Sequence, residues 1–249
     1  MKSFRTRLHN CSCQVRRIFL RLDIIRRCLA VVLGSAGLAW GINVLPTSEA
    51  ADDFRFLEGQ LLQSDAFNPN TLTHKLASPA ARVVRDCDTH SQTALLLMEM
   101  RLAQAALRAG AVAEFEQRAL SMDFRLKRTL ACEPRQSFVW LLAFSLDVMH
   151  GRLNEQALNL LAMSYQTSPN EAWIAIRRMM VAIPLVLIMP EHLKEEVLGE
   201  FQQLVQDGFA REAALPYSSA STSVRALLQA RIERLDPGQQ KQFWDVTRQ

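Results

Sequence analysis

The sequence predicts an all-α protein in which one N-terminal transmembrane helix precedes a domain of helical hairpins. Three observations support this fold class. Residues 28–45 form an apolar run without a charged side chain, long enough at about 1.5 Å per helical residue to reach across the hydrocarbon core of a bilayer. The 9 glycines and 9 prolines stand mostly between segments with helical periodicity. No segment alternates between apolar and polar side chains over the length of a strand, so we expect no sheet.

The first 27 residues form a basic tail that we expect to remain in the cytoplasm. They hold eight lysines and arginines and one aspartate, whereas the rest of the chain holds 21 basic and 24 acidic residues. Because basic residues beside the first apolar segment stay inside, residues 46–249 are predicted to be translocated. The acidic balance of this larger part would repel phosphate, which excludes nucleic acid as a partner.

The anchor itself, residues 28–45, leaves two alternatives open. Ser48 and Ala50 have the small side chains that a signal peptidase requires, so removal of residues 1–50 competes with an uncleaved anchor. The long tail and long apolar run favour the uncleaved form. Gly37 and Gly41 have the spacing of helices that pack closely in membranes, which predicts a homodimer through the anchor. Incidental small residues are the alternative.

Residues 46–92 are predicted to form a juxtamembrane helix and a linker. Apolar side chains share one face of a helix expected over residues 51–63. The prolines, asparagines and serine of residues 66–92 predict a loop.

Residues 93–249 are predicted to form helical hairpins, because apolar residues recur at helical spacing and glycine or proline ends each run. The expected helices cover residues 95–109, 111–132, 134–150, 154–165, 170–181, 191–207, 224–235 and a last segment after Asp236. Residues 182–189 are apolar on all sides and too short to span a bilayer, so we expect a buried core helix that Pro184 kinks or restarts.

One stretch within this domain has the length of a known repeat. Pro134 and Pro169 lie 35 residues apart and each ends a helix pair. This spacing places the small residues Ala157 and Ser145 where the two helices would cross. Residues 138–171 therefore resemble a tetratricopeptide repeat. One clear repeat and a degenerate one before it are fewer than a free-standing solenoid needs, so the other helices must cap them.

The cysteines of the translocated part predict a disulfide. Cys87 and Cys132 both lie after the anchor, where an oxidising compartment favours pairing. We expect their Cα atoms within about 7 Å of each other. The segment from Asp86 to His90 is the densest group of potential metal ligands, but a metal site needs three or four ligands and no second group exists. We therefore predict no metal and no cofactor.

The candidate partner-binding residues are Trp173, Arg177 and Arg178. Trp173 and Arg177 are four residues apart, hence on one helix face, with Arg178 beside them. Aromatic rings stacked with guanidinium groups bind sugars or acidic partners. The alternative is a core Trp173 with arginines that are solvated or paired with Glu171 or Glu196. No catalytic constellation was found, so we predict a protein that is not an enzyme.

The segments SYQTSPNEAWIAIRR and EEVLGEFQQLVQDGF carry a resemblance that covers residues 132–209. This span resembles small bacterial membrane-anchored proteins with tetratricopeptide-like helices, which are often associated with exopolysaccharide or O-antigen production. The resemblance implies a process rather than an activity. Together with the basic tail and the apolar run, it predicts a single-pass protein of the bacterial inner membrane whose bulk is periplasmic. The predicted function is a scaffold that binds a protein partner in the cell envelope. An envelope enzyme with an unrecognised active site and a structural membrane protein that dimerises through its anchor are the alternatives.

Overall fold

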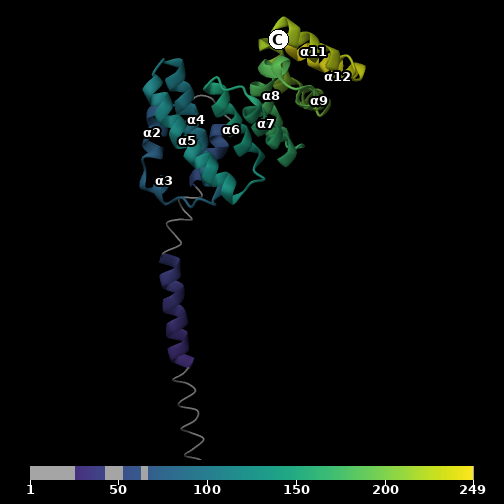
Figure 1. Cartoon of the computed structure of the whole chain (residues 1–249). Coiled ribbons are helices and arrows are strands. Elements are labelled where there is room, and N and C mark those ends of the chain that lie inside the picture. Colours follow the sequence, from purple (N-terminus) through teal and green to yellow (C-terminus); the bar gives the residue numbers. More distant parts are fainter. Residues whose placement is uncertain (1–25, 43–52, 63–66, 249) are drawn as a thin grey trace, which may run out of the picture. The chain divides into compact units, whose positions relative to one another are not determined.

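The computed structural model describes residues 26–42, 53–62 and 67–248. Every regular element in these ranges is a helix and none is a strand, so the all-α fold class is confirmed for the described residues. The chain divides into two compact units, Met1–Asp53 and Phe54–Gln249 (Figure 1).

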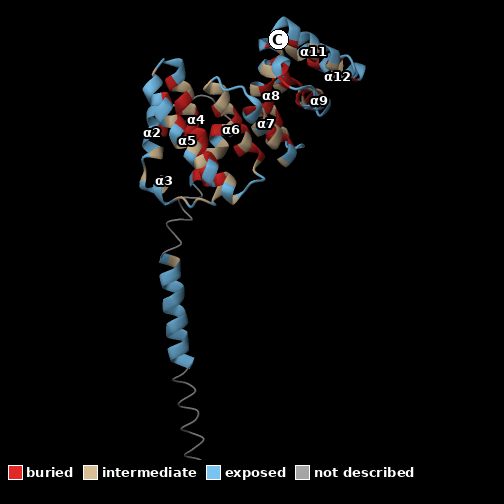
Figure 2. Cartoon of the chain, in the orientation of Figure 1, coloured by how far each residue is buried: buried red, intermediate tan, exposed pale blue. Residues whose placement is uncertain are grey.

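The helix of the first unit spans residues 26–42 and exposes apolar side chains along its length (Figure 2). Val31 and Trp40, for example, are 70% and 71% exposed. The predicted anchor falls mostly on this helix, and its residues 43–45 lie outside the described ranges. So do the predicted tail up to residue 25 and the cleavage alternative around residues 48–50. Among the described helices, none is both long and apolar enough to cross a membrane.

The second unit begins within a helix over residues 53–62, close to the predicted 51–63, and continues with further helices, most of which are labelled in Figure 1. These are α2 (Pro69–Leu76), α3 (Pro79–Val83), α4 (Thr89–Arg108), α5 (Val112–Cys132), α6 (Ser137–Met149), α7 (Glu155–Thr167), α8 (Ala172–Ala182), the 3-10 helix η1 (Ile183–Ile188), α9 (Glu191–Gln206), α10 (Ala210–Ser219), α11 (Thr222–Ile232) and α12 (Pro237–Thr247).

The prediction of a linker over residues 66–92 is wrong. α2 and α3 occupy much of it, and the compact unit begins at Phe54 instead of at residue 93. Asn68 and Ser78 cap these helices, since their side-chain oxygens accept hydrogen bonds from the backbone N–H groups of Asn70 (2.9 Å) and Ala81 (3.2 Å). A proline follows each cap at the first helical position, where its missing N–H is no loss. The residues that suggested a loop are therefore helix starts.

Successive helices pack as hairpins, α4 on α5, α6 on α7 and α8 on α9. Gly110 and Gly151 end α4 and α6 with φ near +68° and +69°, a region that favours glycine because it has no Cβ. The residue after each glycine donates its N–H to a carbonyl five positions earlier, Ala111 to Ala106 and Arg152 to Asp147, both at 2.9 Å. These bonds satisfy the last carbonyls of each helix and turn the chain back sharply.

The apolar run after α8 differs from the predicted buried helix. α8 ends at Ala182, and the chain tightens into η1 because Pro184 cannot donate a backbone hydrogen bond. Ile183 and Val186 are buried, whereas Leu187 and Ile188 are 54% and 60% exposed. The run therefore contributes one side to the core and leaves the other in contact with solvent.

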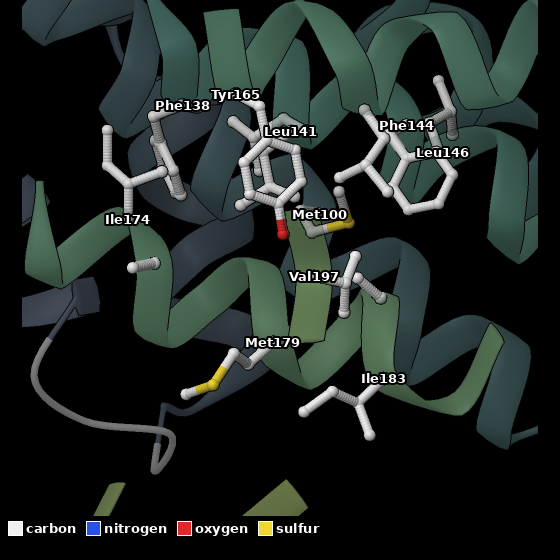
Figure 3. Packing of buried hydrophobic residues seen from close by; sticks show 14 of the residues in the cluster. Met100, Phe138, Leu141, Phe144, Leu146, Tyr165, Ile174, Met179, Ile183 and Val197 are labelled. Carbon is white, nitrogen blue, oxygen red and sulfur yellow. The ribbon is translucent and has the colours of Figure 1, made fainter. Parts of the chain in front are cut away.

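The core of the second unit is continuous from the helix over residues 53–62 to α12. α6 supplies many of its large side chains, and Figure 3 shows Phe138, Leu141 and Phe144 of α6 among residues of α4, α7, α8 and α9. Ala157 is fully buried in α7, which packs on α6. A small side chain at this position agrees with the close helix crossing expected there.

Candidate functional site

The predicted disulfide is confirmed, and it joins the segment before α4 to the end of α5. The Cα atoms of Cys87 and Cys132 are 5.3 Å apart. Two polar contacts accompany it: Arg128 pairs with Asp86, and Thr89 donates a hydrogen bond of 2.6 Å to Glu133. The bond fixes the start of α4 against the end of α5.

The side chains of the segment from Asp86 to His90, the potential metal ligands of the sequence, are engaged in contacts within the protein. Cys87 is in the disulfide, and Nδ1 of His90 lies 3.0 Å from a carboxylate oxygen of Glu58. Burial raises the pKa of Glu58, and the hydrogen bond with His90 acts in the opposite direction. Within the described ranges, no three His, Cys, Asp or Glu residues are grouped so that they could hold a metal ion.

Trp173 and Arg177 share a face of α8, as predicted. The guanidinium carbon of Arg177 lies 5.8 Å from the ring centroid of Trp173, whose indole N–H donates to Glu171 at 2.9 Å. Trp173 is 39% exposed and its ring packs on Phe138, with the centroids 5.0 Å apart. Arg177 also donates hydrogen bonds to the carbonyls of Trp173 (3.0 Å) and Leu62. Trp173 is therefore not a core residue, although one side of its ring packs on Phe138.

The placement of Arg178 on the same partner-binding surface is wrong, because its side chain is fully buried. Its guanidinium donates to Glu200 from Nε at 2.9 Å and from an Nη at 2.6 Å. It also donates to the carbonyl oxygens of Ser164 (2.9 Å) and Ser168 (3.1 and 3.2 Å). Arg178 therefore supports the core by joining α8 to α7 and α9.

Two further side chains complete this buried polar cluster. Ser137 of α6 donates to the carbonyl oxygen of Ser164 at 2.7 Å. The Tyr165 hydroxyl donates to Glu200 at 2.9 Å, and the Tyr165 ring lies 4.4 Å from the guanidinium carbon of Arg178. The cluster thus connects four helices, α6 to α9. Because a buried charge is tolerated only when it is paired and hydrogen-bonded, each partner here depends on the others.

Burial also changes the pKa values of Glu200 and Tyr165 in this cluster. It raises the pKa of Glu200, while the hydrogen bonds from Arg178 and Tyr165 act in the opposite direction. Burial, followed by the negative charge of Glu200, raises the pKa of Tyr165 well above its usual value. Perturbed acids are a feature of many active sites. In this cluster the polar atoms of Glu200, Tyr165 and Arg178 bond to one another. We therefore interpret the cluster as structural.

A polar hollow of about 490 Å³ adjoins the cluster between α7, α8 and α9. Small side chains on α8 and Gly199 on α9 leave this space. It is lined by Tyr165, Gln166, Pro169, Asn170, Ala172, Ala175, Glu196, Gly199, Glu200, Gln203, Leu204 and Asp207.

A second hollow, which we call the apolar groove, has a volume of about 420 Å³ and lies between α4, α6, α8 and η1. Its lining is mostly apolar, and the apolar side chains include one aromatic ring and three methionines. It consists of Leu97, Met100, Arg101, Gln104, Phe138, Leu141, Leu142, Ser145, Val148, Met149, Arg177, Met180, Val181, Pro184 and Leu185.

The ionisable residues that line the apolar groove are Arg101 and Arg177. Both donate hydrogen bonds to the end of the helix over residues 53–62, Arg101 to Leu61 (3.5 Å) and Arg177 to Leu62. Guanidinium groups at the carbonyl end of a helix interact favourably with its dipole. Arg177 thus has a structural contact as well as a position at the groove.

The apolar groove is a feature that sequence reasoning missed, although its residues were assigned to helices. A side chain that lines a groove has the same helical periodicity as one that fills the core. The sequence distinguishes the two only after the relative position of α4, α6 and α8 is known. The helical periodicity does indicate the burial of Arg178, because this residue falls on the buried stripe of α8. The other members of the stripe are Ile174, Ala175, Met179 and Ala182.

No protein-family model, no curated protein and no solved structure matches this chain. The resemblance of residues 132–209 to membrane-anchored polysaccharide-associated proteins stays a prediction. So does a homodimer through Gly37 and Gly41, both of which lie in the helix over residues 26–42.

Proposed function

We propose that this protein is a membrane-anchored helical scaffold whose apolar groove binds a protein partner in the bacterial cell envelope. The observation that carries this proposal is the groove itself, a hollow of about 420 Å³ with a mostly apolar lining between α4, α6, α8 and η1. Grooves of this kind bind the apolar stripe of an amphipathic helix. We therefore assign the occupant as a partner helix with apolar side chains on one face.

The arrangement of the hairpins supports a repeat-like scaffold. α4, α6 and α8 are the first helices of three successive hairpins, and residues of all three line the groove. Ser137 and Ala172, which begin α6 and α8, are 35 positions apart, close to the period of a tetratricopeptide repeat. On this proposal α6 and α7 form one such repeat, and a partner is bound by its first helix and those of its neighbours.

Three features support an anchored protein with its larger unit outside the cytoplasm. The tail before residue 28 is strongly basic. The helix over residues 26–42 exposes apolar side chains all round. The disulfide between Cys87 and Cys132 suits an oxidising compartment. From the resemblance of residues 132–209, we propose that the scaffold acts in polysaccharide assembly or export.

We propose binding and not catalysis for the groove. Its lining offers no acid–base pair, since the ionisable members are the two arginines that also contact the helix over residues 53–62. The hydroxyl of Ser145, which also lines the groove, donates to the carbonyl oxygen of Leu141 at 2.8 Å.

Site-specific crosslinking in cells tests this proposal. A photo-crosslinking amino acid in place of Leu185, which lines the groove, should form a covalent adduct with a distinct envelope protein. The same residue in place of Leu215 is the matched control, because Leu215 is 62% exposed on α10 and outside the groove. We expect the adduct from position 185 alone, and we expect Met180→Asp to abolish it by placing a charge in the groove. No protein adduct at 185, or the same adducts from both positions, contradicts the proposal.

A further inference from the structure

α8 contains two adjacent methionines in opposite environments. Met179 is fully buried in the core, whereas Met180 is 47% exposed and lines the apolar groove. Met180 has the most exposed side chain among the methionines of the described residues. The other two groove methionines are better shielded, Met100 being 5% exposed and Met149 half-buried. Figure 3 shows Met179 and Met100 within the core.

We propose that Met180 is a reversible oxidation site that controls binding in the apolar groove. This inference rests on the proposed function of the groove. Methionine oxidation follows solvent access, so exposure selects Met180 ahead of Met179 and Met100. An envelope protein meets peroxides and hypochlorous acid before they reach the cytoplasm.

The reaction is a two-electron oxygen transfer. The thioether sulfur of Met180 attacks one oxygen of hydrogen peroxide, an S–O bond forms and the O–O bond breaks. The sulfur is oxidised to the sulfoxide, and the other oxygen leaves as water after proton transfer. With hypochlorous acid the net products are the same sulfoxide, a chloride ion and a proton. Methionine sulfoxide reductases reverse the change with thiol electrons.

Oxidation would change the groove without unfolding the domain. The sulfoxide oxygen is a strong hydrogen-bond acceptor, and an apolar partner helix would cover it without donating to it. Since Met180 is half-exposed in the free protein, the same oxygen remains hydrated when no partner is bound. The fold is therefore expected to tolerate the modification, while partner binding weakens by about tenfold to a hundredfold.

The first part of the test uses the purified full-length protein and hydrogen peroxide. Peptide mass spectrometry should find one added oxygen on Met180 before Met179 or Met100, with the melting temperature nearly unchanged. Preferential oxidation of another methionine that leaves Met180 reduced, or unfolding at the stage of a single added oxygen, overturns the proposal.

The second part measures photo-crosslinking from position 185 in cells before and after a peroxide pulse. The adduct should be lost after oxidation in the otherwise unchanged protein, retained in Met180→Leu, and lost again in the buried control Met179→Leu. Met180→Gln, which imitates the polarity of the sulfoxide, should lack the adduct without any oxidant. If the adduct survives when Met180 is oxidised, the switch is wrong and the scaffold function stands. If no adduct forms before oxidation, both fail.

Discussion

At the residue scale, Arg177 and Arg178 are neighbours in the sequence with different roles. Arg177 lies at the apolar groove and contacts the end of the helix over residues 53–62, whereas Arg178 is fully buried against Glu200. One residue corresponds to about 100° around a helix, which is enough to move a side chain from a groove to the core. The predicted surface of three residues is therefore reduced to Trp173 and Arg177.

Replacement of Arg178 should destabilise the domain far more than replacement of Arg177. Arg178→Ala leaves the carboxylate of Glu200 buried without its cation, which we expect to cost about 3–5 kcal/mol. Arg177→Ala should cost only about 1 kcal/mol, since it removes a cation–π contact and hydrogen bonds near the surface. Urea unfolding measures both. In the double variant Arg178→Ala with Glu200→Ala the loss should be less than the sum of the single losses. A cost below 1 kcal/mol for Arg178→Ala would refute the structural role of the cluster.

At the element scale, the hairpin of α6 and α7 is the best-defined repeat-like unit. Ala157 is fully buried in α7, which packs on α6, whereas Asn159 is exposed two residues later. Ala157→Leu should overpack the interface and lower the free energy of unfolding by about 1–3 kcal/mol, again measured in urea. Asn159→Leu adds a similar side chain on the exposed face and should change stability by less than about 0.5 kcal/mol. Equal effects of the two substitutions would show that the helices do not pack closely at Ala157.

The sequence predicted helix ends better than it predicted the loops between them. The sequence indicates helix ends at Gly110 and Gly151, because a positive φ at a helix end favours glycine. Asn68-Pro69 and Ser78-Pro79 have the composition of a loop, although a cap followed by proline is also a helix start. The local sequence pattern does not distinguish a loop from a helix start. The distinction depends on tertiary packing, here the burial of Leu72 of α2 in the core. The apolar groove could not be predicted from the sequence either, because it depends on how helices far apart in the sequence pack.

At the scale of the whole molecule, the proposal requires the larger unit to lie outside the cytoplasm. Alkaline phosphatase fused after residue 249 should be active, because it matures only in an oxidising compartment. This expected topology is based on the eight basic residues before residue 28 and on the Cys87–Cys132 disulfide. A fusion that is active only with a cytoplasmic reporter would reverse the topology, and the cell-envelope function would fall with it.

Binding of a protein partner in the apolar groove is tested most directly by the affinity of groove variants for the protein crosslinked at position 185. Titration calorimetry with the purified partner should show that Met180→Asp weakens binding by at least about tenfold. Leu215→Asp, an equivalent change on exposed α10, should leave the dissociation constant unchanged. Equal affinity for the unsubstituted protein and Met180→Asp, or a loss confined to Leu215→Asp, would contradict the assignment of the groove as the binding site.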